Sequence, residues 1–251
     1  MEVLVLAGGK SDGSIGNHQE LHNKALLMIN GTPMIEYVVD ALNHAQKIDN
    51  IVVVGPQSEL IPYIEKKVNK IIESTDSIVE NVINGINYLN NKQIMIMTSD
   101  VPLITGKMID DFIAKCQEQE AFLYYPFISK ETILEKYPKT VRSYATLKEG
   151  VFCGGNLAVL STKLFDQNKS LLNELYENRK DVKKYITLLG MKFIAKYLLK
   201  CLSIKEIEDR AAEIVGYPVK GIMVNDPEMM IDLDKLTDYE LILQILDESK
   251  K

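Results

Sequence analysis

The sequence has no excess of basic residues, because 29 Lys and Arg stand against 35 Asp and Glu and give a formal net charge of −6. A general nucleic-acid-binding protein usually carries a basic surface, so this balance argues against a nucleic-acid partner. The sequence also lacks an apolar run long enough to cross a bilayer, and it lacks the leader and cleavage site of a secretory signal. We therefore expect a cytoplasmic protein with neither a nucleic-acid partner nor a membrane partner.

Cysteine is also scarce, with three residues in the chain: Cys116, Cys153 and Cys201. They are odd in number and far apart, so their spacing matches neither a zinc site nor a disulfide framework. We expect each of them to be a small buried apolar side chain.

The first 125 residues contain short apolar runs that alternate with stretches of helical periodicity. The apolar runs lie at 2–6, 50–55, 70–73, 93–97 and 121–125. The helical stretches between them lie at 34–45, 58–67, 78–86 and 107–117. This alternation predicts an α/β fold, in which a mainly parallel twisted sheet has helices on both faces.

The later part of the chain is less regular. Residues 129–150 carry Arg142, Tyr144 and Lys148 at near-alternate positions. This spacing indicates either an exposed hairpin or a hairpin face that binds an anionic acceptor. Residues 163–216 have helical character and are rich in lysine, so we expect a helical insertion there that forms a lid or a contact in a homodimer.

Two features directly follow predicted strands, where ligands bind in sheets of this kind. Gly8 and Gly9 follow the first strand. A glycine turn at this place can hold an anion with its backbone N–H groups. The alternative is that these glycines belong to a mobile surface loop. The glycines are adjacent and position 4 is leucine, so neither the dinucleotide-binding pattern nor the P-loop pattern fits. Asp100 follows the fourth strand and is either a Mg²⁺ ligand or a turn former. Thr105 is the more natural cap for the next helix, which leaves Asp100 free.

Five motifs, in this order, carry a resemblance to a known family. They are LAGG at 6–9, NKAL at 23–26, GTPMIEYVVDAL at 31–42, SDVPLIT at 99–105 and MIDLDKLTDYELI at 230–242. With them the chain resembles the nucleotidyltransferase superfamily, in particular its molybdenum-cofactor guanylyltransferase-like and sugar-phosphate nucleotidyltransferase-like branches. The resemblance implies a single Rossmann-like domain of the glycosyltransferase-A type over residues 1–251, with the helical stretch 163–216 inserted in it.

The resemblance also implies roles for individual residues. Lys24 matches the lysine that neutralises phosphate charge, Asp100 matches the aspartate that holds Mg²⁺, and both are the implied catalytic residues. Nucleotide contacts are implied for Leu6, Ala7, Gly8, Gly9, Lys10, Lys24, Ser77 and Asn81. Contacts with the acceptor are implied for Gly154, Gly155 and Asn156.

A further ligand for Mg²⁺ should come from the acidic segment that follows residue 230. Asp232 and Asp234 alternate with Leu233, so on a short strand both carboxylates share one face and complete a cation site. The alternative is a surface position, or a cap before a final helix whose own capping box is Thr237 with Glu240. Competing candidates for the ligand are Asn225 and Asp226.

Together these expectations describe a Mg²⁺-dependent nucleotidyltransferase. It would transfer a nucleoside monophosphate from a nucleoside triphosphate to a small phosphorylated acceptor, such as a sugar phosphate, a cofactor or a phosphoalcohol, and release pyrophosphate. The family loop usually carries an arginine after its glycines, whereas no arginine lies between Gly9 and Lys24 here, and Lys10 is the only lysine between them. Two alternatives therefore stay open: a glycosyltransferase that uses a nucleotide-sugar, and a non-catalytic nucleotide-binding regulatory protein.

Overall fold

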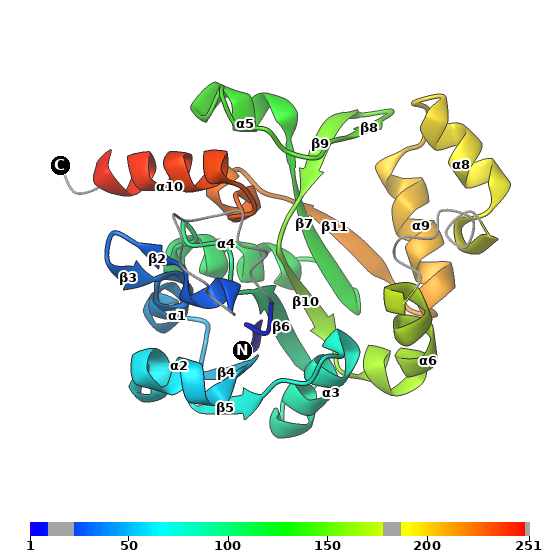
Figure 1. Ribbon diagram of the computed structural model, residues 1–251. Coiled ribbons are helices and arrows are strands. Elements are labelled where there is room, and N and C mark those ends of the chain that lie inside the picture. The colour runs from blue at the N-terminus through cyan, green and yellow to red at the C-terminus, as the bar shows by residue number, and fades with distance from the viewer. Residues whose placement is uncertain (10–22, 178–186, 249–251) are drawn as a thin grey trace.

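β1 (Glu2–Leu6) lies in the middle of the sheet, where it pairs in parallel with β4 (Asn50–Gly55) on one side and β6 (Gln93–Thr98) on the other. β5 (Lys70–Glu73) extends this parallel part beyond β4. This computed structural model describes residues 1–9, 23–177 and 187–248 (Figure 1). The strands predicted in this part of the sequence are confirmed, and so is the mainly parallel arrangement of its centre.

The second part of the sheet is mixed rather than parallel. β10 runs antiparallel between β6 and β7, β9 pairs antiparallel with the far end of β7, β8 pairs antiparallel with β9, and β11 runs parallel to β7. These strands are β7 (Leu123–Ser129), β8 (Ala145–Leu147), β9 (Gly150–Gly154), β10 (Leu157–Ser161) and β11 (Val219–Met223). The whole sheet has nine strands within the described residues.

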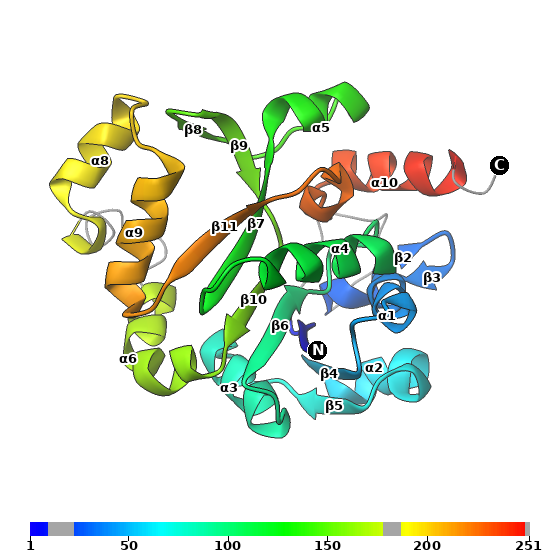
Figure 2. The same cartoon turned by 180° about the vertical axis from the view of Figure 1, so that it is seen from behind.

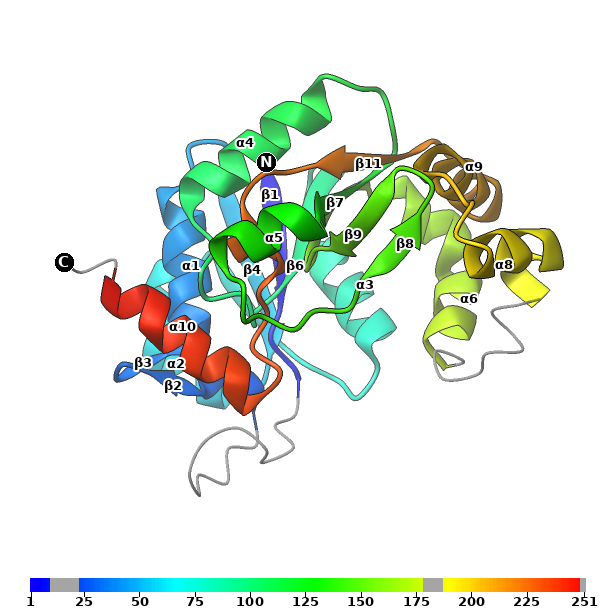
Figure 3. The same cartoon turned by 90° about the horizontal axis from the view of Figure 1, so that it is seen from above.

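Helices cover both faces of this sheet (Figures 2 and 3). The α-helices are α1 (Met34–His44), α2 (Gln57–Ile64), α3 (Ile78–Tyr88), α4 (Gly106–Gln117), α5 (Lys130–Lys136), α6 (Lys163–Glu177), α8 (Met191–Leu198), α9 (Ile204–Val215) and α10 (Leu236–Glu248). Short 3-10 helices span Lys24–Leu26, Glu65–Lys67 and Pro227–Met230, and β2 (Met28–Ile29) forms a small hairpin with β3 (Thr32–Pro33).

The two faces of the sheet bury alternate residues of β1. Val3 and Val5 are fully buried in a cluster that also contains the apolar faces of α1 and α4. Leu4 points to the opposite side and packs with Val82 of α3 and Leu164 of α6. Figure 3 shows α4 on one side of the sheet and α3 on the other. The strand is apolar throughout because both of its faces are covered, as is usual for the centre of a parallel sheet.

A third apolar cluster joins the two ends of the described chain. Ile231, Leu233 and Ile242, from α10 and the stretch before it, pack against residues that include Leu27 and Ile29 near the β2–β3 hairpin. This packing brings the acidic segment next to Lys24, although the two are far apart in the sequence.

The structure corrects two expectations for the middle of the chain. The stretch 129–150 forms α5 before its hairpin, because Ser129 caps that helix by accepting a hydrogen bond from Thr132 N–H. Cys201 is exposed, whereas Cys116 and Cys153 are buried as expected.

The described part of 163–216 contains α6, α8 and α9, and α8 lies at the edge of the molecule in Figure 1. Phe193 of α8 and Ile204 of α9 pack against an apolar cluster that includes Leu147 of β8 and Phe152 of β9, which attaches these helices to the sheet. Their assignment as an insertion within a single domain stays a prediction. None of the described helices is long and apolar enough to cross a membrane.

Candidate active site

Asn23 fastens the short helix that carries Lys24 to the end of β1. Its side chain donates a hydrogen bond to Ala7 O (3.0 Å) and accepts one from Ala25 N–H (2.9 Å). The backbone N–H of Lys24 donates to Gly9 O at 2.9 Å. Because Asn23 is buried and both bonds are made at once, the Lys24 side chain starts from a fixed position beside the glycine turn.

Asp100 leaves the end of β6 next to the same turn. The backbone N–H of Ser99 donates to Leu6 O at 3.2 Å, and Thr105 caps α4 by accepting from Met108 N–H. As expected, Asp100 is not needed as that cap. Its Oδ2 accepts a hydrogen bond from Lys24 Nζ at 2.6 Å. Its Oδ1 is buried and has no hydrogen-bond partner among the residues that the structure describes.

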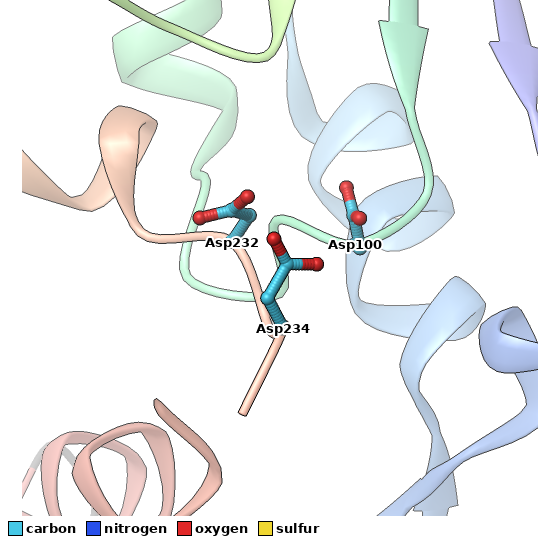
Figure 4. Close-up of side chains that lie close together, drawn as sticks. All are labelled: Asp100, Asp232 and Asp234. Carbon is cyan, nitrogen blue, oxygen red and sulfur yellow. The ribbon is translucent and has the colours of Figure 1, made fainter. Parts of the chain in front are cut away.

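The acidic segment brings two more carboxylates to Asp100 (Figure 4). Leu233 N–H donates to Asp100 O at 2.9 Å, and Leu233 itself is fully buried. Asp232 and Asp234 therefore project to the other side of an extended stretch, toward Asp100, as the alternation in the sequence predicted. One carboxylate oxygen from each of the three aspartates lies within 4.8 Å of the others. Of the competing candidates, Asp226 is not part of this group and Asn225 is exposed.

Lys24 lies between two of these carboxylates, since its Nζ is 2.6 Å from Asp100 Oδ2 and 2.5 Å from Asp234 Oδ1. Burial lowers the pKa of Lys24, but the two carboxylates outweigh burial and hold the pKa above its usual value. Burial raises the pKa of Asp234, but the hydrogen bond from Lys24 outweighs it and leaves that pKa below its usual value. The Lys24 ammonium and the Asp234 carboxylate are therefore both ionised at neutral pH.

Asp232 differs from its neighbours. Burial and the nearby charge of Asp234 raise its pKa to about 6, although the Arg142 guanidinium opposes this shift. Arg142 contacts the carboxylates of both Asp232 and Asp238. Four carboxylates thus face two cations, so the cluster carries a charge of −2 when all its groups are ionised.

The donor set fits a hard divalent cation. Mg²⁺ prefers oxygen ligands and is usually held by one or two carboxylates together with phosphate oxygens. Asp100, Asp232 and Asp234 supply three carboxylates from two chain segments, the unpartnered Asp100 Oδ1 can accept a further contact, and the cluster has the opposite charge. These three residues are the ones that would hold the ion.

A pocket of about 650 Å³ opens beside the carboxylates, at the carboxyl ends of the parallel strands. Its walls are formed by Leu6, Gly8, Gly9, Lys24, Val54, Ser74, Thr75, Asp76, Ile78, Asn81, Thr98, Ser99 and Asp100. Six of the residues that the sequence assigned to nucleotide binding or catalysis therefore line one cavity. Lys10, which was also assigned, lies outside the described residues.

Two of the assigned residues have other contacts in the structure. Ala7 is fully buried and its N–H donates to Val54 O at 2.8 Å, so it does not line the pocket. Ser77 caps α3 by accepting from Glu80 N–H at 3.3 Å, and it is not a wall residue either. The backbone N–H of Ala7 and the side chain of Ser77 thus have hydrogen-bond partners within the fold.

The loop after β5 supplies a wall that the sequence reasoning did not identify. Asn81 holds this loop because its Oδ1 accepts from Thr75 N–H (2.7 Å) and its Nδ2 donates to Thr75 O (3.0 Å). Gly8 lies close to Ser74 of the loop: a Cβ at position 8 would come within 3.3 Å of Ser74 Cβ. Asp76 completes this wall. The sequence signal for this wall is its position directly after a parallel strand, which it shares with the glycine turn after β1 and Asp100 after β6.

The assigned acceptor residues form a bend between β9 and β10. Gly155 N–H donates to Pro126 O (3.0 Å) and Gly155 O accepts from the Tyr125 hydroxyl (2.7 Å). Asn156 O accepts from Thr98 N–H at 3.1 Å, next to the pocket. At Gly154 a Cβ would lie 2.7 Å from the Tyr125 hydroxyl oxygen. These backbone groups fix the bend beside the pocket, and none of the three residues lines the cavity itself.

Comparison with known proteins gives matches over most of the chain. The family profile described as "MobA-like NTP transferase domain" matches residues 3–186. A 2-C-methyl-D-erythritol 4-phosphate cytidylyltransferase of Clostridium botulinum is 30% identical over 130 residues, which are 48% of this chain and 56% of that protein. A ribitol-5-phosphate cytidylyltransferase of Lacticaseibacillus paracasei is 27% identical over 156 residues, 57% of this chain and 64% of that protein. The matches therefore span little more than half the length of these two relatives.

Solved structures give matches over nearly the whole chain. A hypothetical transferase from Thermus thermophilus superposes with a TM-score of 0.83 and 31% identity, over 95% of this chain and 98% of that one. A 2-C-methyl-D-erythritol 4-phosphate cytidylyltransferase, also from Thermus thermophilus, superposes with a TM-score of 0.58 and 14% identity, covering 98% of each chain. At that identity the second match shows a shared fold.

Proposed function

The chain belongs to the family of MobA-like NTP transferase domains, and from this we propose that it is a nucleotidyltransferase that transfers a nucleoside monophosphate to a small phosphorylated acceptor and releases pyrophosphate. One observation carries the proposal: Lys24 and three carboxylates meet at the edge of a 650 Å³ pocket at the carboxyl ends of the parallel strands. Two of the relatives described above are named as cytidylyltransferases of phosphorylated polyols. We therefore propose CTP as the nucleotide and a polyol or sugar phosphate as the acceptor.

The reaction requires alignment and charge neutralisation rather than a general base. A phosphate oxygen of the acceptor attacks the α-phosphorus of the triphosphate, the bond to the β-phosphate oxygen breaks, and pyrophosphate leaves with the electron pair. The attacking phosphate is already an anion, so no proton has to be removed from it. The protein contributes by holding both anions in position and by placing cations against the charge of the transition state.

Different residues of the pocket would bind the nucleotide, neutralise its phosphates and hold the ion. The turn at Gly8 and Gly9 and the loop at 74–76 would contact the nucleotide, since both line the cavity. The Lys24 ammonium would donate to phosphate oxygens, because it lies at the pocket wall and stays charged at neutral pH. Asp100, Asp232 and Asp234 would hold Mg²⁺, which when bound neutralises phosphate charge and helps to orient the oxygens.

Release of pyrophosphate tests this proposal directly. The protein would be mixed with each of CTP, ATP, GTP and UTP, Mg²⁺ and a panel of sugar and polyol phosphates, and pyrophosphate would be measured. We expect release with CTP and one class of acceptor. Lys24→Ala and Asp100→Ala should each lower turnover at least about a hundredfold, equivalent to about 2.7 kcal/mol in the activation free energy. Lys107→Ala is the control, because the Lys107 side chain is 83% exposed and lies on α4 outside the pocket.

Other results would indicate the alternatives. Consumption of a nucleotide-sugar without pyrophosphate release would indicate a glycosyltransferase. Binding of nucleoside triphosphates without turnover on any acceptor would indicate a regulatory protein. Near-normal turnover in Lys24→Ala or Asp100→Ala would show that the assigned roles are wrong.

A further inference from the structure

Arg142 is held in an unusually complete set of contacts behind the acidic segment. Its side chain is 7% exposed. Nε donates to Thr140 Oγ1 (3.3 Å), Nη1 donates to Asp232 O (3.2 Å) and to the Asp232 carboxylate, and Nη2 donates to Asp238 Oδ1 (2.5 Å). The guanidinium thus uses four of its five N–H groups.

The contact with Asp238 extends this hold to the second aspartate of the segment. Asp238 Oδ1 faces Arg142, while Asp238 Oδ2 accepts from the backbone N–H groups of Asp234 (3.1 Å) and Lys235 (2.9 Å). Asp238 is itself buried. Through one carboxylate, Arg142 therefore reaches the backbone of Asp234 as well as the side chain of Asp232.

The third apolar cluster anchors Ile231 and Leu233 of the acidic segment, but few backbone hydrogen bonds fix the aspartates between and after them. Residues 231–234 are extended but belong to no strand, so no ladder of sheet hydrogen bonds fixes their side chains. One backbone hydrogen bond, from Leu233 N–H to Asp100 O, joins this stretch to the loop after β6. A planar guanidinium suits the remaining task, because it can donate to two carboxylates at fixed angles, whereas a lysine ammonium is a single mobile point of charge.

Lys24 and Arg142, the two cations of the cluster, pair with different carboxylates. Lys24 bridges Asp100 and Asp234 with its Nζ, on the side of the pocket. Arg142 bridges Asp232 and Asp238 and does not line the pocket. Lys24 thus pairs with two of the three carboxylates that would hold an ion, while Arg142 braces the segment that supplies two of them.

We infer that Arg142 is a positioning residue of the cation site, which holds Asp232 directly and Asp234 through Asp238 so that both can act together with Asp100. This inference rests on the proposed role of the three aspartates in holding a divalent cation. It adds a residue from the stretch before β8 to a site built otherwise from β1, β6 and the acidic segment.

The positioning role and a purely electrostatic role of Arg142 predict opposite changes in cation affinity when Arg142 is replaced. If Arg142 acted only through its charge, removing it would strengthen the binding of a divalent cation, because one nearby positive charge would be lost. If Arg142 positions the carboxylates, removing it weakens binding. Lys24→Met should strengthen binding in the absence of nucleotide, because it removes a competing cation without loosening the acidic segment.

The experiment is a titration of the full-length protein with Mn²⁺, without nucleotide, with free Mn²⁺ measured by electron paramagnetic resonance. We expect the dissociation constant to rise at least about tenfold in Arg142→Met and to fall in Lys24→Met. Arg142→Lys keeps the charge but cannot bridge both carboxylates, so its dissociation constant should also rise; this variant serves if Arg142→Met does not fold. Arg210→Met is the matched control, because Arg210 pairs with Glu213 on α9, away from the site, and its constant should equal that of the wild type.

The outcomes separate the inference from the proposed function. Suppose that the wild-type protein binds Mn²⁺. Unchanged or tighter binding in Arg142→Met, or wild-type affinity in Arg142→Lys, would then overturn the positioning role alone. A wild-type protein that binds no Mn²⁺ would overturn the cation site, and the positioning role with it. Unfolding temperatures of all variants, measured without metal, show whether any loss of binding is accompanied by loss of the fold.

Discussion

Asp232 and Asp234 show how two aspartates of the same segment come to have different acid–base properties. Asp234 is exposed and faces the Lys24 ammonium, which lowers its pKa. Asp232 is partly buried, and burial together with the charge of Asp234 raises its pKa to about 6. Lys24, the partner that distinguishes Asp234 from Asp232, is far away in the sequence. Spacing alone placed both carboxylates on one face, and it contained no information on which of them would meet a lysine.

The raised pKa of Asp232 predicts a pH dependence of cation binding. With a pKa of about 6, the ionised fraction of Asp232 falls from about nine tenths at pH 7 to about one tenth at pH 5, so Mn²⁺ binding should weaken about tenfold. Lys24 stays charged throughout because its pKa is raised, and Asp234 stays ionised because its pKa is lowered. Titrations with Mn²⁺ at the two pH values measure the change.

Asp232→Asn is the control for this dependence. The variant should bind the ion more weakly at pH 7 and should lose most of the change between pH 7 and pH 5. Equal affinity of the wild type at both pH values would show that Asp232 does not titrate in this range.

At the scale of secondary-structure elements, α4 connects the site to the helical layer. Gly106, its first residue, lies against the end of α1: a Cβ there would come within 2.7 Å of Ala45 N and of His44 C. These are backbone atoms and cannot rotate away. The close approach fixes α4, and α4 in turn fixes the end of the loop that begins at Asp100.

Gly106→Ala should therefore push α4 away from α1 and lower the free energy of unfolding by about 1–3 kcal/mol, which is the usual cost of overpacking. Urea unfolding measures it. Lys107→Ala, at the next position, should stay within about 0.5 kcal/mol of the wild type because its side chain is 83% exposed. Equal stabilities of the two variants would contradict the close contact.

The helix caps show where local sequence patterns suffice and where they do not. Thr105 caps α4 as predicted, because the donor and acceptor lie three residues apart. The box predicted from Thr237 and Glu240 is wrong: α10 begins at Leu236, so Thr237 lies inside the helix. The Asp238 carboxylate binds the N–H groups before the helix instead, and Arg142 holds that carboxylate from a distant part of the chain.

At the scale of the whole molecule, the parallel half of the sheet was predictable and the mixed half was not. Each unit from β1 to β6 repeats a strand and a helix that are neighbours in sequence, so apolar periodicity is enough. β10 enters between β6 and β7, and β11 returns to pair with β7. β10 and β11 pair with strands that are not their neighbours in sequence, and no local sequence pattern specifies such pairing. The family resemblance points to the carboxylates at the end of β6 and in the acidic segment together. The spacing of Arg142 indicates only a hairpin face, whereas the structure buries the side chain of this residue, which lies before β8, against Asp232 and Asp238.

Ligand binding should stabilise the whole fold, because residues between Leu6 and Asp100 line the pocket and the acidic segment adds two carboxylates beside Asp100. CTP with Mg²⁺ at about 100 times its dissociation constant should add about 2.7 kcal/mol to the free energy of unfolding, seen as a rise in the unfolding temperature. Omitting Mg²⁺, or using Asp100→Ala with Mg²⁺, should remove most of the increase. An increase of the same size in all three cases would show that nucleotide binding does not involve the carboxylates.

The acidic segment is made late, since Asp232 and Asp234 follow every strand of the sheet that the structure describes. Chains generally fold from the N-terminus as the ribosome releases them. A nascent chain that has emerged only as far as β10 already contains the glycine turn, Lys24 and Asp100, but it lacks two of the three carboxylates. Such a chain would lack two of the three proposed ion ligands, so the proposed activity would require α10 and the segment before it to be in place.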